Sequence, residues 1–440
     1  MKPYLITEHG ASAEADYATN RRAIQSLIDE LGAEGGGLVV VPPGRFRTGG
    51  LTLRSGITLR LEDGAALLGS DREEDYDKHF IEHFSTSGGS RFYCSLIFAE
   101  GCENIAIEGP GTIDGQGGAE AWRCYPIPDG DGAWHKPSRP WGIRLWKCRE
   151  IRLENYRLQA SAEWGHHLCD CENLTVRGLD IFNHANANND GLDLDGCRNV
   201  LIEHCQIDAD DDAFCIKSTG FRVNRNIHLR YCTLASRCRI IHIGSESSGP
   251  IEEVLIEHCS LVRTKARHKI DANRSDEAAH AISIESVEGS VVRNLRFQDL
   301  TIEGCHTAFF VNLGFRGADR PKYAGHRLEP GRIEDLHFSR ISGTVASPVA
   351  SSFTASDGLG PLQGLHFADL QFQVPGNPSL EEGEVSEVQV SWEPRAFGTD
   401  LPARGLYFRN VLGVTLDNVH FVARASDSRP EVVWENERRK

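Results

Sequence analysis

The sequence predicts an all-β protein, a single-domain parallel β-solenoid of 440 residues with an N-terminal capping helix. Two observations support this fold class: a short strand motif recurs many times, and helical periodicity disappears after the first segment. The length agrees, because a solenoid grows by adding coils, whereas a single globular core stops growing near ~250–300 residues. We therefore expect one domain over residues 1–440, with a cap over about 1–45 and a tail over about 425–440.

The N-terminal segment carries the helical signal. Apolar residues recur there at a spacing of three to four: Ala23, Ile24, Leu27, Ile28 and Leu31. Asp16 or Thr19 would cap this helix at its start, and the glycines at 35–37 would end it. The apolar run at 38–41 then reads as a buried strand, stopped by the Pro-Pro-Gly at 42–44. We expect the helix to cover the first coil, because an open parallel edge invites association.

The repeat has a step in the twenties. Its copies read CENIAIEG (102–109), CREIRLEN (148–155), CENLTVRG (171–178), CRNVLIEH (197–204), NRNIHLRY (224–231) and IEEVLIEH (251–258), with weaker copies at 292–299, 332–339, 362–369 and 411–418. The first apolar strand positions are 151, 174, 200, 227 and 254, so the steps are 23, 26, 27 and 27 residues. The next two steps, to 295 and 336, are 41 residues each. Such a period favours a β-solenoid, because the Leu/Asn pattern and helical half of leucine-rich repeats are missing. The cysteines that open several copies predict a column of small buried residues at a turn.

Composition excludes several classes of protein. Lys and Arg number 47 against 63 Asp and Glu, so the net charge of −16 disfavours nucleic acid and anionic lipid as partners. No apolar stretch approaches the ~18 residues of a membrane-spanning helix. The 13 cysteines contain no CxxC pair, which argues against zinc ribbons and thioredoxin-like motifs. No signal peptide is visible in MKPYLITEHG, so we expect reduced thiols in a cytoplasmic protein.

Long interruptions leave the repeat at 71–92, 118–141, 263–280 and 314–331, and loops on a rigid scaffold often carry recognition. Trp122, Trp134 and Trp141 lie within or at the edge of the second interruption, where they would stack on sugar rings or seal the coils. The last two interruptions hold clusters of Lys and Arg. In so acidic a chain these clusters favour an anionic ligand, with solvated loop charge as the alternative.

The densest run of acids lies in two consecutive coils, NNDGLDLDG (188–196) and DADDDAFCIKS (208–218). Asp190 precedes Asp211 and Asp212 by 21 and 22 residues, about one coil, so we expect the three carboxylates together on one exposed face. The alternation of apolar residues also turns Asp193, Lys217 and His242 outward. Clustering raises the pKa of one carboxyl group, and glycoside hydrolysis needs such an acid beside an ionised base. A solvated Asp ladder and a Ca²⁺ site are the alternatives.

At these residues the sequence resembles glycoside hydrolase family 28, the polygalacturonase family of right-handed parallel β-helices. The family's Asn-Thr-Asp corresponds to 188–190, and its Gly-Asp-Asp to 210–212, followed by a matching Ile-Lys-Ser at 216–218. The segments at 108–117 and 35–53 also agree. The resemblance implies that Asp211 is the general acid and that Asp190 and Asp212 activate water. It further implies inverting hydrolysis of α-galacturonosyl bonds in pectin-derived saccharides, with neither metal nor cofactor.

Two family motifs are changed. Cys238-Arg239-Ile240 stands where the family has Gly-His-Gly, with His242 just after it, and no Arg-Ile-Lys is present. Residues 269–271 or the AISIES strand at 281–286 occupy that region. These changes concern the binding of a substrate carboxylate, so we expect an acidic saccharide bound at an altered subsite. The substrate-binding candidates are His167, Asn188, Asp193, Lys217, Arg239, His242 and Glu246. A Ca²⁺-dependent lyase or epimerase and a non-catalytic carbohydrate-binding β-helix remain as alternative functions.

Overall fold

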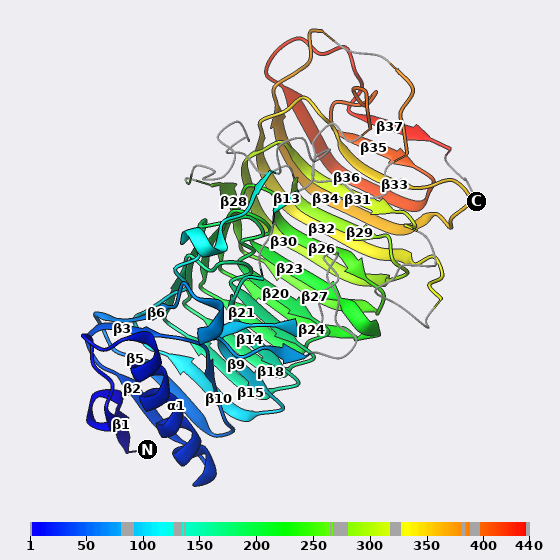
Figure 1. Ribbon diagram of the computed structural model, residues 1–440. Helices are drawn as coiled ribbons and strands as arrows, with labels where there is room; N and C mark the ends of the chain where they lie inside the picture. Colours follow the sequence, from blue (N-terminus) through cyan, green and yellow to red (C-terminus); the bar gives the residue numbers. More distant parts are fainter. Residues whose placement is uncertain are drawn as a thin grey trace. The chain divides into compact units, whose positions relative to one another are not determined.

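The computed structural model describes residues 2–80, 92–126, 134–135, 138–264, 266, 280–316, 327–379, 383–387 and 397–436. They form two compact units. Figure 1 draws their helices and strands, coloured along the sequence. Unit 1 holds the described residues up to Asp211 together with residue 266, and unit 2 holds the remainder from Asp212 onward. Each unit consists of coils whose strands pair in parallel with those of the next coil, as expected for a right-handed parallel β-helix. The single-domain organisation stays a prediction.

The N-terminal cap forms as the sequence predicts. Helix α1 spans Tyr17–Ala33, and Asp16 is its N-cap, because its side chain accepts a hydrogen bond of 2.8 Å from the Thr19 amide. Strand β1 (Pro3–Leu5) pairs with β2 (Gly37–Val41) of the first coil. Gln25 of the helix exchanges two hydrogen bonds with the backbone of Thr52, at 2.8 and 2.9 Å. Across the described residues, no helix is both long and apolar enough to span a bilayer.

In unit 1 each coil adds strands to three rows. The first row is β2, β5 (Ile57–Leu61), β10 (Glu103–Glu108), β15 (Arg149–Glu154), β18 (Glu172–Arg177) and β21 (Arg198–Glu203). The second row is β3 (Gly44–Thr48), β6 (Ala65–Gly69), β11 (Thr112–Asp114), β16 (Arg157–Gln159), β19 (Asp180–Asn183) and β22 (Gln206–Ala209). The third row is β4 (Leu51–Thr52), β9 (Ser95–Glu100), β14 (Trp141–Trp146), β17 (His166–Cys169) and β20 (Leu192–Asp195).

Unit 2 has the same three rows, with the first two merging into long strands. The first row is β24 (Asn224–Arg230), β27 (Ile251–Glu257), β30 (Val291–Cys305), β32 (Arg332–Val345), β34 (Leu362–Val374) and β36 (Val411–Ala423). The second row begins with β25 (Thr233–Ser236) and β28 (Ser260–Arg263), which continue into the second half of β30. The third row is β23 (Phe214–Ser218), β26 (Arg239–Ser247), β29 (His280–Ser286), β31 (Thr307–Leu313), β33 (Ser351–Ala355), β35 (Leu406–Arg409) and β37 (Val432–Glu435).

Short elements leave the coils. Two antiparallel pairs are β7 (His79–Phe80) with β8 (Phe92–Tyr93), and β12 (Tyr125–Pro126) with β13 (Trp134–His135). The 3-10 turns are η1 (Ile6–His9), η2 (Glu73–Asp75), η3 (Glu120–Trp122) and η4 (Thr219–Phe221).

The strand register confirms the alignment of the sequence repeats. In unit 1, Ile151 pairs with Leu174, which in turn pairs with Val200. In unit 2, Val254 pairs with both Ile227 and Leu295. The steps of 41 residues therefore keep the same strand positions in register.

The recurring asparagine of the motif has a backbone cause. It adopts a left-handed conformation in copy after copy, with φ between 54° and 58° at Asn104, Asn173, Asn199, Asn226 and Asn294. Asparagine tolerates this region better than other side chains do, apart from glycine. The side chains also join neighbouring coils, because Asn199 Nδ2 donates to Asn173 Oδ1 over 2.9 Å.

The predicted cysteine column is also present. Cys148, Cys171 and Cys197 are at most 1% exposed. Each thiol donates to a backbone carbonyl, with Sγ to O distances of 3.3 Å to Trp146, 3.4 Å to Cys169 and 3.0 Å to Leu168. All 13 cysteines are buried and free of disulfides. They therefore act as small core residues.

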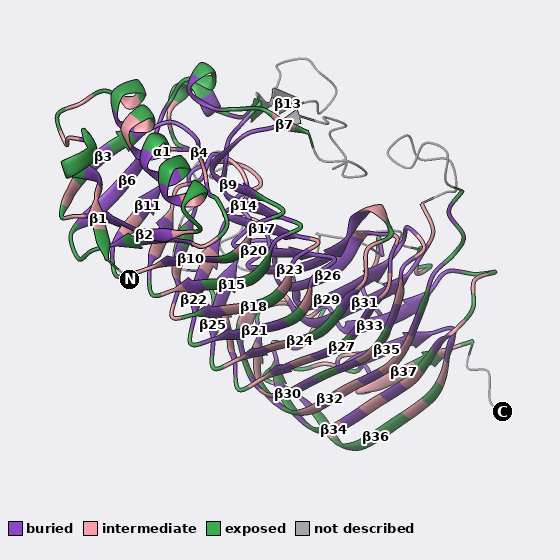
Figure 2. Ribbon diagram, turned by 90° about the horizontal axis from the view of Figure 1, so that it is seen from below, coloured by how far each residue is buried: buried purple, intermediate pink, exposed green. Residues whose placement is uncertain are grey.

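The strands in the middle of the third row are buried on both faces, which the sequence did not indicate. Every residue of β14, β17, β20, β23 and β29 is buried, whereas strands of the first row alternate between buried and exposed positions (Figure 2). The expectation that all three acids lie on an exposed face is therefore wrong: Asp190 is 3% and Asp212 1% exposed, whereas Asp211 is partly exposed. Buried ion pairs lie beside this row, as the contact between Arg239 of β26 and Asp212, which precedes β23, illustrates.

Candidate active site

The predicted site residues fall in both units. Unit 1 contains His167, Asn188, Asp190, Asp193 and Asp211, and unit 2 contains Asp212, Lys217, Arg239, His242 and Glu246. Asp211 and Asp212 are consecutive in the chain, and the boundary between the units lies between them.

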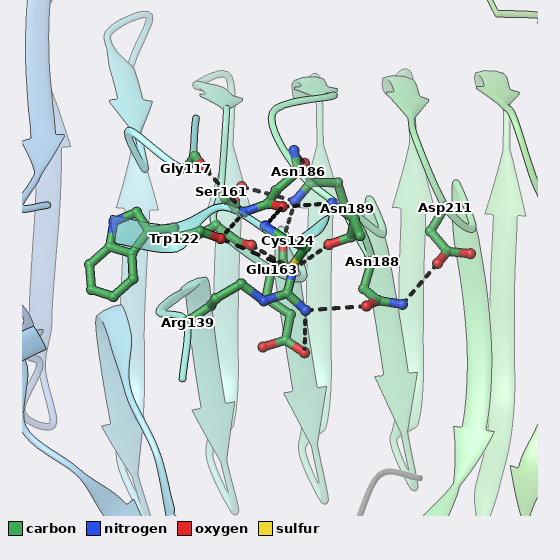
Figure 3. Close-up of polar contacts among 12 residues, drawn as sticks. Gly117, Trp122, Cys124, Arg139, Ser161, Glu163, Asn186, Asn188, Asn189 and Asp211 are labelled. Carbon is green, nitrogen blue, oxygen red and sulfur yellow. Dashed lines mark hydrogen bonds and ion pairs between the residues drawn. The ribbon is translucent and has the colours of Figure 1, made fainter. Parts of the chain in front are cut away.

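In unit 1 an asparagine-rich turn links β19 to β20 and is tied to earlier coils (Figure 3). Asn186 Nδ2 donates to the carbonyl oxygens of Gly117 (3.2 Å) and Trp122. Asn189 Nδ2 donates to the carbonyl oxygens of Ser161 (2.9 Å) and Glu163 (2.8 Å). Buried backbone carbonyls need such donors, so these amides fix the path of the turn.

Asp190 follows directly and is held through its backbone. Its carbonyl oxygen accepts from the Asn183 side chain at 2.9 Å and from the Gly165 amide at 2.8 Å. A side chain at Gly165 would approach this carbonyl to 3.0 Å, so glycine permits the close contact between the two coils. The side chain of Asp190 therefore projects from a fixed backbone position just before β20.

Asp211 is joined to the same turn at two points. Its amide donates to the carbonyl oxygen of Asn189 over 3.3 Å, and its Oδ2 accepts from Asn188 Nδ2 over 3.2 Å. Arg139 donates to Asn188 Oδ1 over 3.2 Å and forms an ion pair of 3.3 Å with Glu163 (Figure 3). Asn188, named from the sequence as a substrate-binding candidate, thus contacts the proposed acid directly.

Two other carboxylates of the acid run bind a histidine. His184 Nε2 lies 2.8 Å from Asp208 Oδ1, and its Nδ1 lies 3.6 Å from Asp210 Oδ1. Burial alone would lower the pKa of His184, but the hydrogen bonds with Asp208 and Asp210 outweigh it and raise that pKa. Asp208 and Asp210 therefore share a structural partner that carries the opposite charge when it is protonated.

His167 lies in the interior of unit 1. It is fully buried on β17, its Nε2 is 3.4 Å from Asp195 Oδ2, and its ring meets Trp141 edge-on at 5.0 Å. Asp193 is its partner in β20 and is fully buried too. The guanidinium carbon of Arg144 lies 3.9 Å from the ring centre of Trp141. The roles predicted for His167 and Asp193 in substrate binding stay predictions.

In unit 2 Asp212 belongs to a buried ion-pair cluster. Arg239 Nε lies 2.9 Å from Asp212 Oδ1, and its Nη2 lies 3.3 Å from Asp212 Oδ2. Its Nη1 lies 3.3 Å from Glu285 Oε1, which also accepts from the Ser283 hydroxyl at 3.0 Å. Burial raises the pKa of Glu285, although the charge of Arg239 opposes this. The guanidinium of Arg239 thus already faces two carboxylates of the protein.

His242 lies on β26 close to this cluster and is neutral at ordinary pH. It is 1% exposed, and burial together with the positive charges of Arg239 and Lys217 holds its pKa well below the usual value. Lys217 is 5% exposed on β23, while Glu246 is partly exposed on β26. Their predicted contacts with substrate stay predictions.

Two tryptophans of the interruption at 118–141 have side chains that the structure describes. Trp122 is 2% and Trp141 1% exposed, and Trp141 packs against Trp164 with ring centres 4.6 Å apart. These two indoles therefore seal the coils and leave no face for a sugar. The Trp134 side chain and most basic residues of the interruptions at 263–280 and 314–331 lie outside the described residues.

A calcium site has no support at the acids of unit 2. Asp212, Cys215 and His242 place one ligand atom each within 4.8 Å of one another. Ca²⁺ prefers six to eight oxygen ligands, whereas this group offers sulfur and nitrogen. Arg239 already neutralises Asp212. Metal-free chemistry nevertheless stays a prediction.

The coils and their carboxylates define the class of right-handed parallel β-helix proteins. Within that class the chain belongs to the glycosyl hydrolases family 28, because the model of that family matches residues 81–390. This range contains Asp190, Asp211 and Asp212. The family match favours a hydrolase over the lyase, epimerase and binding-protein alternatives.

Individual relatives agree with the family. A probable polygalacturonase of Vitis vinifera is 31% identical over 269 residues, which cover 57% of this chain and 53% of that protein. The chain thus spans about half the length of this relative. An endo-polygalacturonase of Pectobacterium carotovorum subsp. carotovorum is 25% identical over 298 residues, covering 64% of this chain and 71% of that protein. The family 28 exopolygalacturonase of Yersinia enterocolitica shares the fold with a TM-score of 0.70 at 18% identity, covering 96% of this chain and 77% of that one.

Several residues of the site escaped the sequence analysis. Arg139 and Glu163 lie outside strands, where no alternation marks them, and Glu285 lies on a strand noted only for a missing motif. His184 gave no signal, because its partners belong to another coil. The crowded asparagines at 183–189 were a usable signal, since several buried amides in one turn must have partners.

Proposed function

We propose that this protein hydrolyses α-linked galacturonosyl-type bonds in pectin-derived oligo- or polysaccharides, with inversion of configuration. The observation that carries the proposal is the match of the family model to residues 81–390, the part of the chain with the Asn-Asn-Asp and Asp-Asp-Asp motifs. The printed names of the relatives, polygalacturonase and endo-polygalacturonase, support the same class of substrate.

In this proposal Asp211 protonates the leaving glycosidic oxygen, and Asp190 and Asp212 activate the attacking water. An inverting hydrolase needs an acid on one side of the bond and a base that holds water on the other. Asp211 suits the acid, because it is partly exposed and its Oδ2 accepts a hydrogen bond from the neutral amide of Asn188. Asp212 suits the base, because its bidentate contact with Arg239 favours the ionised carboxylate.

The test is incubation with polygalacturonate and with defined oligogalacturonides of two to six units. We expect new reducing ends, a β-configured product seen first by NMR, and no unsaturated product absorbing in the ultraviolet. The size of the early products separates exo from endo action. An unsaturated product would identify a lyase, and binding without turnover would identify a carbohydrate-binding protein.

We also propose that the protein works in a reducing compartment such as the cytoplasm. Thirteen buried thiols without a disulfide support this proposal. Thiol titration of protein isolated from its natural source, denatured without reductant, should find all 13 cysteines reactive. A substantial loss of reactive thiols would contradict the proposal.

A further inference from the structure

We infer that Arg139 and Asn188 orient the side chain of Asp211 so that its Oδ1, and not its Oδ2, carries the proton that the acid delivers. The inference rests on the proposed function, because Asp211 is the acid proposed there. It assigns to Arg139, which lies just before β14, the part of a positioning residue.

Donor chemistry fixes the orientation of the Asn188 amide. A guanidinium group only donates hydrogen bonds, so the atom of Asn188 that faces Arg139 Nη2 at 3.2 Å must be Oδ1. The other atom, Nδ2, then faces Asp211 and donates to its Oδ2 over 3.2 Å (Figure 3). Both hydrogen bonds therefore have the same direction: Arg139 donates to Asn188, and Asn188 donates to Asp211.

Arg139 is itself held in one orientation. Its side chain is 2% exposed, and its Nη1 donates to the carbonyl oxygens of Ala162 (2.9 Å) and Ala187. The carboxylate of Glu163 lies 3.3 Å from its Nη2. Since Ala187 precedes Asn188 directly, the same guanidinium fixes both the backbone of the turn and the amide of its next residue.

A consequence for the acid follows. An amide NH₂ group only donates, and the carbonyl oxygen of a neutral carboxyl group accepts more strongly than its hydroxyl oxygen, so the contact with Asn188 favours the proton on the other oxygen. In neutral Asp211 the proton therefore sits on Oδ1, while Oδ2 remains the acceptor in both protonation states. A general acid needs its proton aimed at the leaving oxygen, and this arrangement disfavours one of the two oxygens that could carry it.

The experiment compares pH–rate profiles of Asn188→Asp and Arg139→Gln with that of the unmodified protein on an oligogalacturonide. In Asn188→Asp an acceptor replaces the donor beside Asp211 and adds a negative charge. The upper limb should move to higher pH by about one unit, because a neighbouring carboxylate favours the protonated acid. We expect kcat to fall about 10- to 100-fold with a much smaller change in KM.

Arg139→Gln releases the Asn188 amide, which then also turns Oδ1 toward Asp211. The upper limb of the pH–rate profile should again move to higher pH, but by a smaller amount than in Asn188→Asp. Arg139→Lys restores a donor and should return the limb toward its original position. Asn189→Ala is the matched control, since it removes buried side-chain hydrogen bonds of the same turn and keeps the backbone carbonyl through which Asn189 contacts Asp211. This control should lower the melting temperature and leave the limb in place.

The outcomes separate the inference from the proposed function. If Asn188→Asp and Arg139→Gln lower kcat equally at every pH with an unmoved limb, their role is structural and the inference is wrong. The proposed function stands in that case, provided that Asp211→Asn is inactive. If Asp211→Asn retains full turnover on the natural linkage, the proposed function fails and the inference falls with it.

Discussion

Arg239 meets Asp212 with two of its nitrogen atoms, at 2.9 and 3.3 Å, while its third contact, at 3.3 Å, goes to Glu285. Asp212 and Glu285 are at most 1% exposed. The residue proposed to activate water is therefore also a structural member of the interior of unit 2. This double role separates it from Asp211, its neighbour in the chain.

Replacement of Asp212 by Ala should destabilise the protein by about 3–5 kcal/mol, because it leaves a buried guanidinium with one of its two carboxylates. Urea unfolding at pH 7 measures this change. Asp63→Ala, at an exposed position after β5, is the control and should stay within about 0.5 kcal/mol of the unmodified protein. An equal, small effect of both substitutions would show that the ion pair adds nothing to stability.

Replacement of Asp211 by Asn should reduce kcat by about 10²–10⁴-fold on the natural linkage, because the acid acts only in the transition state. KM should change little. The loss should shrink on a substrate with a good leaving group, which needs less protonation. Steady-state kinetics on both substrates measure the difference, and Asp190→Asn, which affects water activation, should impair both substrates alike.

Replacement of Glu285 by Gln should lower KM for an acidic oligogalacturonide by a factor of about 3–10 at pH 7, because Arg239 then faces one carboxylate fewer. KM for the fully methyl-esterified oligosaccharide should not change. Parallel kinetics on the acid and the ester measure the effect. A similar change for both substrates would mean that Glu285 acts through the fold and not through charge.

The free energy of unfolding should fall as the pH falls below about 6.5. Burial lowers the pKa of His280 to about 3 and that of His166 to about 4, from a usual 6.5. Between these values an unfolded histidine binds a proton that the folded one does not, so acid favours unfolding. Urea titrations from pH 7 to 4 measure the slope. His280→Gln should flatten it, whereas His420→Gln, at an exposed position, should not.

Removal of metal ions should leave the activity unchanged. Protonated and ionised carboxylates perform the proposed chemistry without an ion, and Arg239 supplies the positive charge next to Asp212. Dialysis against EDTA followed by the reducing-end assay measures this. Activity that disappears and returns with Ca²⁺ would instead point to the lyase chemistry of the alternative hypothesis.

The sequence predicted the coils well because their physical causes are local. Alternating apolar residues, a left-handed asparagine and a small thiol each mark one position of a coil, and register then follows from their repetition. Asn173 and Cys171 illustrate this, since both occupy the places that the repeat assigns to them. The helix at the N-terminus was predicted for the same reason, from its apolar spacing and its N-cap.

The environment of the acids could not be predicted in the same way. Whether Asp212 is exposed depends on Arg239 and Glu285, which lie 27 and 73 residues further along and meet it only after the coils have stacked. Alternation indicates which way a side chain points, but it does not reveal what covers that side. The pairing of His184 with Asp208 was missed for the same reason.

The register of the rows has an evolutionary consequence. Leu295 pairs with Val254 across a step of 41 residues as regularly as Leu174 pairs with Ile151 across a step of 23. An insertion at a turn therefore leaves every strand partner where it was, and mutation is free to lengthen or replace such a segment without disturbing the rest. Selection for a new saccharide can therefore act on these turns with little loss of stability, whereas a substitution within a buried strand of the third row disturbs the interior and costs more stability.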